Sequence, residues 1–302
     1  MAACLHRPGF MFNGSIAALV TPFTGRGEID FAALEKLARF HRENGTDALV
    51  IAGTTGESAT LTAPEYTALL KWAVGRFDGV LPVLAGTGSA STAVAVERTR
   101  LACGLGADAV LVVTPYYNRP TQKGLEAHFR TVADASDKPL VLYNVPTRTA
   151  VDLQPETVER LSGHPRIVGI KEAVGAPERV RELVSRCGAG FTVLSGDDGS
   201  CLSAMKEGAR GVVSVAANVA PGAMRELCAE AAAGNWERAE RLNDRLRPLF
   251  RALMLESNPI PVKWSLCEMN LIGPGIRLPL TELDESLRAP LRQCLSELGL
   301  LK

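Results

Sequence analysis

Residues 15–53 read SIAALVTPFTGRGEIDFAALEKLARFHRENGTDALVIAG: a short apolar run, an amphipathic stretch and a second apolar run. The middle part predicts a helix, because Asp30 stands at its start as an N-cap and Gly45 follows its end. The two apolar runs show no clean alternation of apolar and polar residues, which is typical of parallel strands buried on both faces. Strand and helix together make one βα unit.

The same unit recurs along the chain at intervals of roughly 25–30 residues, the size of a βα unit. The next helix is predicted from Thr62, because Glu65 has the spacing of a capping box. The eight apolar runs lie at 15–23, 48–53, 80–86, 109–115, 139–146, 166–173, 191–196 and 211–219. The amphipathic stretches between them lie at 30–45, 62–77, 91–106, 121–136, 154–164, 177–188 and 201–209.

Eight uniform βα units predict a closed (β/α)8 barrel, the TIM barrel of the α/β class, which typically needs about 250 residues. An open doubly wound sheet is the alternative. It is disfavoured because no GxGxxG follows the first strand, where such a sheet binds a dinucleotide.

From about residue 222 the pattern is helical only. We interpret this part as the eighth barrel helix followed by a helical extension that packs on the side of the barrel. The predicted helical stretches are 224–255, 259–271 and 285–301. The predicted division is an N-terminal extension (1–10), a (β/α)8 barrel (11–235) and a C-terminal helical extension (236–302).

The composition excludes several classes of function. The chain carries 33 basic and 33 acidic side chains, which argues against binding to nucleic acid or to an anionic membrane. The sequence contains no apolar run of about 18 residues, the length needed to span a bilayer. The N-terminus lacks the apolar stretch of a secretory signal. Seven scattered cysteines without a CxxC and four isolated histidines indicate neither a disulfide framework nor a metal site. We therefore expect a soluble, cytoplasmic, metal-free protein.

Polar segments follow six of the apolar runs, at the strand ends where TIM barrels carry their active sites. Glycine and threonine there let backbone N–H groups approach a carboxylate ligand closely. One such segment alone would be an ordinary turn, but six at one end of a barrel indicate a site. The segments are GTTGES (53–58), GTG (86–88), TPYYNRP (114–120), YNVPTR (143–148), SGDD (195–198) and the residues from Ser214 onward.

Lys171 directly follows the apolar residues 167–170 in the sixth run. Burying an ammonium costs several kcal/mol, so a lysine in a covered strand is favoured as the neutral amine. A neutral amine attacks carbonyl groups and forms Schiff bases. The alternative is that Lys171 pairs with Glu172 or reaches solvent and has no catalytic role. The polar segments around it favour the catalytic interpretation.

A Schiff-base lysine needs a proton relay, because carbinolamine formation, dehydration and carbanion formation all move protons. Tyr143 ends the strand next to that of Lys171, and a phenol exchanges protons when neighbouring hydroxyl groups relay them. Thr55, Tyr117 and Tyr143 are the candidates for such a chain of hydroxyl groups. Core-filling tyrosines are the alternative.

Three charged residues of these segments are further candidates. The Arg148 guanidinium matches a carboxylate bidentately and would select a substrate with a second carboxylate, although a surface arginine is the alternative. Asp197 and Asp198 could form a metal or acid–base pair. Because no histidine stands near them, we expect a structural or loop-capping role instead.

Seven strings in this order and spacing resemble the dihydrodipicolinate synthase family, a group of pyruvate-dependent class I aldolases and lyases. Each string is moderately specific, and the match runs from about Met11 to the C-terminus. The strings are GTTGES, TPYYNRP, YNVPTRT, GIKEA, SGDD, GVVSVAANV and NPIPVKWSL.

The resemblance implies catalytic roles for four residues. Lys171 of GIKEA would hold pyruvate as an imine, and Tyr143 of YNVP would relay protons, with no other cofactor and no metal. Thr55 and Tyr117 would complete the relay. The resemblance places Tyr117 in the neighbouring subunit of a tight dimer, within a homotetramer built as a dimer of dimers.

The resemblance also implies how the substrates are held. The hydroxyl groups of Thr54 and Thr55, with nearby backbone amides, would bind the pyruvate carboxylate. Arg148 would bind the carboxylate of aspartate semialdehyde. Gly196 and Val213 complete the implied substrate-binding set.

The implied reaction is the Schiff-base condensation of pyruvate with L-aspartate 4-semialdehyde. It gives 4-hydroxy-tetrahydrodipicolinate, in diaminopimelate and lysine biosynthesis, and makes the protein a lyase. The alternative is a sibling aldolase that cleaves sialic acid or a hydroxy-oxo acid, which would usually lack the PYYNRP string and the arginine. A barrel kept only for ligand binding would be expected to lose Lys171 or the relay.

Lysine-inhibited members of the family bind the amino acid at the tight-dimer interface, through two histidines, an asparagine and a glutamate. Val94 replaces the carboxylate that would pair with the ligand's ammonium, and Ala90 replaces an amide. We therefore expect weak or absent inhibition by L-lysine. The four changed positions are Ala63, Tyr66, Ala90 and Val94, whereas Ser58, Ala59 and Tyr116 are kept.

Overall fold

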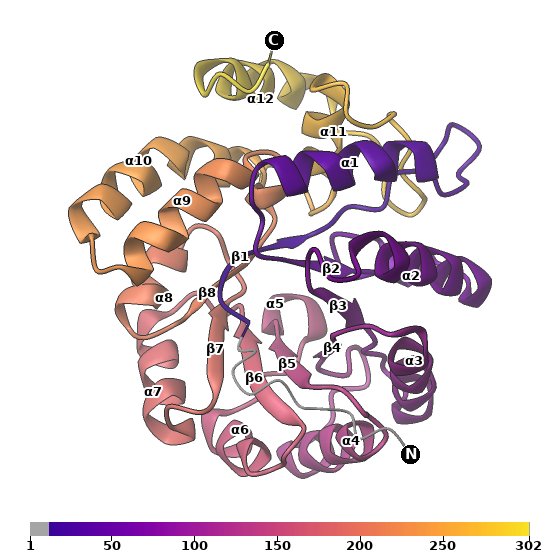
Figure 1. Cartoon of the computed structure of the whole chain (residues 1–302), viewed down its shortest axis with the longest axis vertical. Helices are drawn as coiled ribbons and strands as arrows, with labels where there is room; N and C mark the ends of the chain where they lie inside the picture. Colours follow the sequence, from indigo (N-terminus) through magenta and orange to yellow (C-terminus); the bar gives the residue numbers. More distant parts are fainter. Residues whose placement is uncertain (1–11, 302) are drawn as a thin grey trace.

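The computed structural model describes residues 12–301 and shows a closed barrel of eight parallel strands (Figure 1). Each strand pairs with the next one, and β1 pairs with β8, which excludes the open sheet. The prediction of a TIM barrel is confirmed. The strands are β1 (Gly14–Ala18), β2 (Ala48–Ile51), β3 (Val83–Gly86), β4 (Ala109–Val113), β5 (Leu140–Asn144), β6 (Ile167–Glu172), β7 (Thr192–Ser195) and β8 (Gly211–Ser214).

Helices surround the barrel and connect its strands (Figure 1). Those between β1 and β8 are α1 (Phe31–Glu43), α2 (Ala63–Phe77), α3 (Thr92–Leu105), α4 (Gln122–Asp134), α5 (Pro146–Thr149), α6 (Pro155–Ser162), α7 (Pro177–Cys187) and α8 (Cys201–Lys206). Those after β8 are α9 (Pro221–Ala232), α10 (Trp236–Ala252), α11 (Ile260–Glu268) and α12 (Glu285–Glu297). Short 3-10 helices follow β2 and β8, at η1 (Ser58–Thr60) and η2 (Ala216–Asn218).

The helix-boundary signals of the sequence are confirmed. The Asp30 side chain accepts a hydrogen bond from the Ala33 amide at 2.9 Å, as an N-cap should. Thr62 and Glu65 form the reciprocal capping box that starts α2. Gly45, just after α1, has φ 68°, a left-handed conformation that glycine adopts without steric cost.

Two apolar layers hold the barrel together. Along β1, Ile16 and Ala18 belong to a cluster inside the barrel, whereas Ala17 belongs to the larger cluster between strands and helices. Side chains of a strand alternate between its two faces, so both faces of each strand are covered. This arrangement explains why the strand sequences read as continuous apolar runs.

The C-terminal helices continue from the last barrel helix. The predicted stretch 224–255 forms most of α9 and all of α10, and Gly234, with φ 77°, lies between the two helices. Helix α10 packs on α9 and α12, and α11 packs on α12 and η2 (Figure 1). The barrel with added C-terminal helices is confirmed, while the boundary between residues 235 and 236 stays a prediction. The predicted extension 1–10 lies outside the described residues.

No helix within residues 12–301 is long and apolar enough to cross a membrane.

Candidate active site

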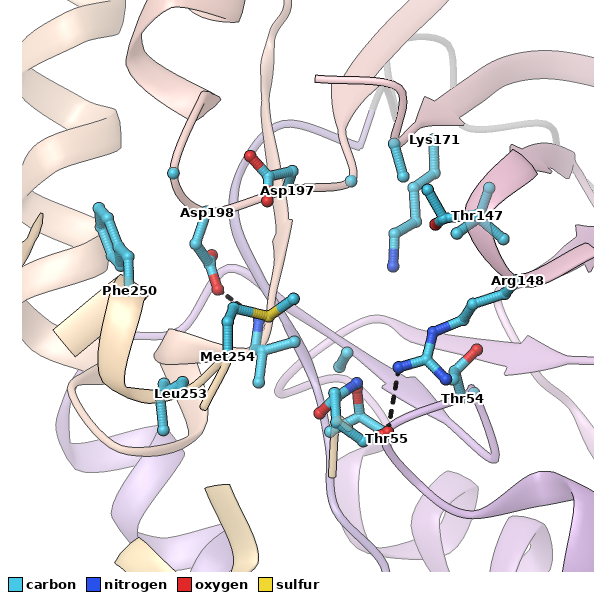
Figure 2. A pocket seen from close by; sticks show the side chains of 18 of the residues that line it. Thr54, Thr55, Thr147, Arg148, Lys171, Asp197, Asp198, Phe250, Leu253 and Met254 are labelled. Atoms are coloured by element: carbon cyan, nitrogen blue, oxygen red, sulfur yellow. Dashed lines mark hydrogen bonds between the residues drawn. The ribbon is translucent and has the colours of Figure 1, made fainter. Parts of the chain in front are cut away.

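A cavity of about 460 Å³ opens at the C-terminal ends of the strands. Strand ends and their loops form one wall, and α10 with the chain that follows it forms the other (Figure 2). Tyr117 and Val213, which the sequence also assigned to the site, do not line this cavity. The predicted residues that do line it are Thr54, Thr55, Tyr143, Arg148, Lys171 and Gly196.

The alternation of side chains along β5 and β6 turns Tyr143 and Lys171 into the barrel. Leu142 and Ile170 pack in the outer cluster, so the next residue of each strand faces inward. Tyr143 and Lys171 are register partners, and the Lys171 Nζ lies 4.2 Å from the centre of the Tyr143 ring. Lys171 is only 6% exposed, and its amine extends into the cavity (Figure 2).

Glu172, the next residue, has its own set of partners. Both of its carboxylate oxygens accept from Asn144 Nδ2 at 3.1 Å, and Oε1 accepts from the Val174 amide at 2.9 Å. Burial raises the pKa of Glu172 to about 7, while the hydrogen bond from Asn144 opposes the shift. Its ion-pair partner is Arg179, at 3.9 Å, and no ion pair of the described residues includes Lys171. The alternative of a Lys171–Glu172 pair is therefore excluded.

The turn after β2 brings two threonines to the cavity. Thr55 is 2% exposed, and its Oγ1 accepts a hydrogen bond from Asn258 Nδ2 at 2.9 Å. The backbone amides of Gly56 and Ser58 both donate to the Gly53 carbonyl. Within the described chain the backbone amides of Thr54 and Thr55 make no hydrogen bond, so they can donate to a bound carboxylate.

Arg148 reaches the cavity from α5, a four-residue helix that the sequence patterns did not indicate. Pro146 stands at the start of α5. A backbone N–H at this position would have no partner within the helix, so the missing N–H of proline costs no hydrogen bond. The Arg148 Nη2 donates to the Asn258 carbonyl at 3.1 Å, drawn as a dashed line from the guanidinium in Figure 2. A guanidinium has five N–H donors, so most of them remain for a ligand.

Gly196 and Val213 occupy different surroundings. The Gly196 amide donates to the Glu172 carbonyl at 2.7 Å, and a Cβ at this position would lie 2.7 Å from that of Ala173. Only glycine therefore lets the end of β7 approach the end of β6 beside Lys171. Val213 is 1% exposed and packs in the inner cluster, so its contact with substrate stays a prediction.

The two aspartates after β7 hold loops. Asp197 accepts from the backbone and hydroxyl of Ser200 at 2.8 and 2.6 Å. Asp198 accepts from the amides of Val215 and Ala216 at 3.0 and 2.8 Å, and the Val215 bond is visible beside Asp198 in Figure 2. No group of three or more His, Cys, Asp or Glu side chains in residues 12–301 could hold a metal.

Tyr117 does not line the cavity of its own chain. It is 93% exposed, and its backbone has φ 72°, which is costly for a non-glycine residue. The Tyr143 hydroxyl makes no hydrogen bond to Thr55 within the described residues. The chain of three hydroxyl groups is therefore not formed by one copy of the protein.

The sequence patterns missed the wall that the C-terminal helices contribute. Phe250, Leu253 and Met254 face the cavity from the end of α10 and the loop after it (Figure 2). Asn258 follows them and contacts both Thr55 and Arg148. The string NPIPVKWSL contains Asn258, but nothing in its spacing indicated which strand end it meets.

Comparison with known proteins identifies the family. Over residues 11–298 the sequence matches the Dihydrodipicolinate synthetase family. The chain belongs to this family. The 4-hydroxy-tetrahydrodipicolinate synthase of Stutzerimonas stutzeri is 54% identical to it over 291 residues, which are 96% of this chain and 100% of the relative. The dihydrodipicolinate synthetase family and the lyase class predicted from the sequence strings are confirmed.

Solved structures of the dihydrodipicolinate synthetase family share the fold. The chloride-inhibited dihydrodipicolinate synthase of Acinetobacter baumannii, in complex with pyruvate, is 48% identical with a TM-score of 0.95, over 96% of this chain and 100% of that one. A structure described as the first monomeric dihydrodipicolinate synthase variant is 43% identical with a TM-score of 0.94, over 96% and 98%. Membership of the family therefore leaves the number of subunits open.

Proposed function

We propose that the chain condenses pyruvate with L-aspartate 4-semialdehyde to 4-hydroxy-tetrahydrodipicolinate, through an imine between pyruvate and Lys171. The observation that carries the proposal is a buried lysine amine without a counter-ion, 4.2 Å from a tyrosine ring centre and in one cavity with Arg148. The name of the S. stutzeri relative and the pyruvate bound to the A. baumannii relative support the same reaction.

The imine formed on Lys171 is the electron sink of the reaction, so the proposal includes no metal and no separate cofactor. The amine adds to C2 of pyruvate, and the carbinolamine loses water to give the imine. Loss of a proton from C3 gives an enamine, and its C3 attacks the aldehyde carbon, whose oxygen becomes a hydroxyl group. The amine of the second substrate then displaces the lysine, which closes the ring and frees the enzyme.

A substrate panel tests this function. Pyruvate with L-aspartate 4-semialdehyde should give the cyclic product, measured by mass spectrometry as both substrates disappear. Sialic acid and a hydroxy-oxo acid, the substrates of sibling aldolases, should not release pyruvate at a comparable rate. Cleavage of either one with a higher kcat/KM than the condensation would replace the proposed function by that of the sibling.

We further propose that the proton relay contains Tyr143 and Thr55 of one copy and Tyr117 of a second copy, in a homotetramer built as a dimer of dimers. The support is the position of Tyr117, which is 93% exposed on a left-handed backbone and absent from its own cavity. Insertion into a partner would bury this ring and offset the cost of its conformation.

Subunit mixing tests the shared tyrosine. Tyr117→Phe and Lys171→Ala homo-oligomers should each be nearly inactive, because each lacks one group at every site. A mixed dimer contains one site with both groups intact, so mixing under conditions of subunit exchange should restore activity. Restoration to at most about half of the parent rate per exchanged dimer is expected. Absence of restoration, with exchange shown by native mass spectrometry, would contradict a shared site.

Arg148 is expected to select the second substrate. Arg148→Ala removes charge-assisted hydrogen bonds worth about 1.5–3 kcal/mol, which corresponds to a loss of about 10–150-fold. The loss should appear in kcat/KM for the aldehyde, while imine formation with pyruvate persists. Equal losses for the imine and for the condensation would instead indicate that Arg148 only holds the Asn258 segment.

L-Lysine is expected to inhibit weakly or not at all. Val94 offers no carboxylate, and the Arg98 guanidinium lies 5.6 Å from the ring centre of Tyr66, another of the changed positions. Desolvating an ammonium without a counter-charge costs several kcal/mol, and about 1.4 kcal/mol is tenfold in affinity. An inhibition titration measures this directly. Half-inhibition at submillimolar lysine would show that another group supplies the charge.

We propose a cytoplasmic location for the enzyme. The supporting observation is a set of free thiols spread over the described chain, which is typical of a reducing compartment. The free cysteines are Cys103, Cys187, Cys201, Cys228, Cys267 and Cys294.

A further inference from the structure

Asn258 joins the C-terminal helices to the two catalytic segments of the barrel. It lies between α10 and α11 and is 8% exposed. Its Nδ2 donates to Thr55 Oγ1 at 2.9 Å, and its carbonyl accepts from Arg148 Nη2 at 3.1 Å. One residue of the C-terminal part thus contacts both Thr55, a member of the proposed relay, and Arg148, the residue proposed to bind the substrate carboxylate.

The position of Asn258 is fixed by a second buried contact one turn along α11. The Lys263 amine donates to the Thr21 carbonyl at 3.0 Å and pairs with the Glu57 carboxylate. Glu57 also accepts from the Arg277 amide at 3.2 Å, and it belongs to the same turn as Thr55. Lys263 and Glu57 are 4% and 3% exposed. The start of α11 and the turn after β2 are therefore held to each other at two points.

The amide of Asn258 determines what the Thr55 hydroxyl can do. A hydroxyl group has one proton and two acceptor lone pairs. The Asn258 amide occupies one lone pair, and Thr55 makes no other side-chain hydrogen bond within the described residues. The hydroxyl proton of Thr55 is thereby left to point at a group in the cavity.

Asn258 also has a feature that the fold does not require. Its Oδ1 is buried and has no hydrogen-bond partner among the described residues. An unpaired buried carbonyl destabilises a protein, whereas an apolar side chain of similar shape would fill the same space without that cost. The amide is therefore best explained by its bond to Thr55.

We propose that Asn258 is a positioning residue, whose side chain orients the Thr55 hydroxyl as the proton-donating end of the relay. The C-terminal helices then complete the active site in addition to packing on the barrel. This inference rests on the proposed function. It assigns Asn258 an effect on the rate of proton transfer and none on the final extent to which the imine forms.

A double-mutant cycle tests the inference. Asn258→Asp keeps the shape but can only accept a hydrogen bond when ionised, so it takes the Thr55 proton out of the relay. We expect kcat to fall about 10–100-fold, part of the roughly 10²–10⁴-fold that a general acid–base group supplies. In a Thr55→Val background the same change should lower kcat by less than about twofold, because the hydroxyl is already gone. Asn258→Ala, in both backgrounds, repeats the cycle without the added charge.

Two further measurements separate the possible outcomes. Asn270→Asp, an exposed asparagine of the same C-terminal part, is the matched control and should keep the parent kcat. Borohydride trapping of pyruvate should remain at the parent level in all Asn258 variants, and its absence in the parent would overturn the proposed function instead. The role of Asn258 would be overturned by any of three results. These are losses in kcat that multiply in the Thr55→Val background, a parent-like kcat of Asn258→Asp, and a parent-like kcat of Thr55→Val.

Discussion

Replacing Lys171 with alanine should abolish both turnover and the covalent capture of pyruvate. The loss of kcat is expected to be on the order of 10⁴–10⁶-fold, the scale observed when an enzyme loses its covalent nucleophile. The reason is that no imine can form, so C3 of pyruvate never becomes a carbon nucleophile. In the parent enzyme, borohydride with pyruvate should leave a reduced three-carbon adduct on Lys171, located by peptide mass mapping.

A second buried lysine provides the internal control for this experiment. Lys263 is as buried as Lys171, at 4% and 6% exposure, but it pairs with Glu57 and donates to the Thr21 carbonyl. An ammonium held in this way has no free lone pair for a carbonyl carbon, and Lys263 lines no part of the large cavity. We therefore expect no adduct on Lys263. An adduct there, or an unmodified Lys171 in an active enzyme, would refute the assignment.

The fold could be predicted because its pattern is local and repeated. Each strand is covered on both faces, so it appears as an apolar run, and the first helices show caps, namely Asp30 and the Thr62–Glu65 pair. Repetition of these signals eight times left a closed barrel as the best arrangement. The short helix α5 could not be predicted, because four residues are too few to show a helical period.

The part of the site on the strand ends could be predicted for the same reason. Once the barrel is known, Lys171 and Tyr143 must lie side by side, because the strands that carry them are neighbours. Asn258 could not be placed, since it meets Thr55 across 203 residues through the packing of α11, which no period of the sequence encodes. Tyr117 could not be placed by one chain at all, because its proposed partners belong to a second copy.

The two buried lysines show why burial alone does not identify a catalytic group. Both side chains are removed from water and lie over an aromatic ring, Lys171 at 4.2 Å from Tyr143 and Lys263 at 4.4 Å from Phe23. Only Lys263 has a carboxylate partner within the described residues. The Glu57 carboxylate and the Thr21 carbonyl occupy the Lys263 amine, whereas the Lys171 amine lines the cavity and makes no hydrogen bond or ion pair within the described residues. The distinction depends on the contacts of each amine, which only the structure supplies.

Tyr143→Phe should separate proton transfer from imine formation. The change removes a single oxygen and leaves the ring beside the Lys171 amine, so packing in the inner cluster and access to pyruvate are kept. We expect kcat to fall about 10²–10⁴-fold, the usual contribution of a general acid–base group. Borohydride trapping of pyruvate on Lys171 should still reach completion, although more slowly, because dehydration of the carbinolamine also needs a proton.

Tyr66→Phe is the matched control, because Tyr66 is a tyrosine of similar burial that does not line the cavity. Its hydroxyl is buried without a partner among the described residues, and burial raises the pKa of this phenol well above its usual value. Its removal should leave kcat within about twofold of the parent, since no hydrogen bond is lost. A Tyr143→Phe enzyme that also kept near-parent turnover would place the relay elsewhere. The hydroxyl of Thr55, held by Asn258, would then be the group left to test, because it is the other hydroxyl of the proposed relay that lines the cavity of the same chain.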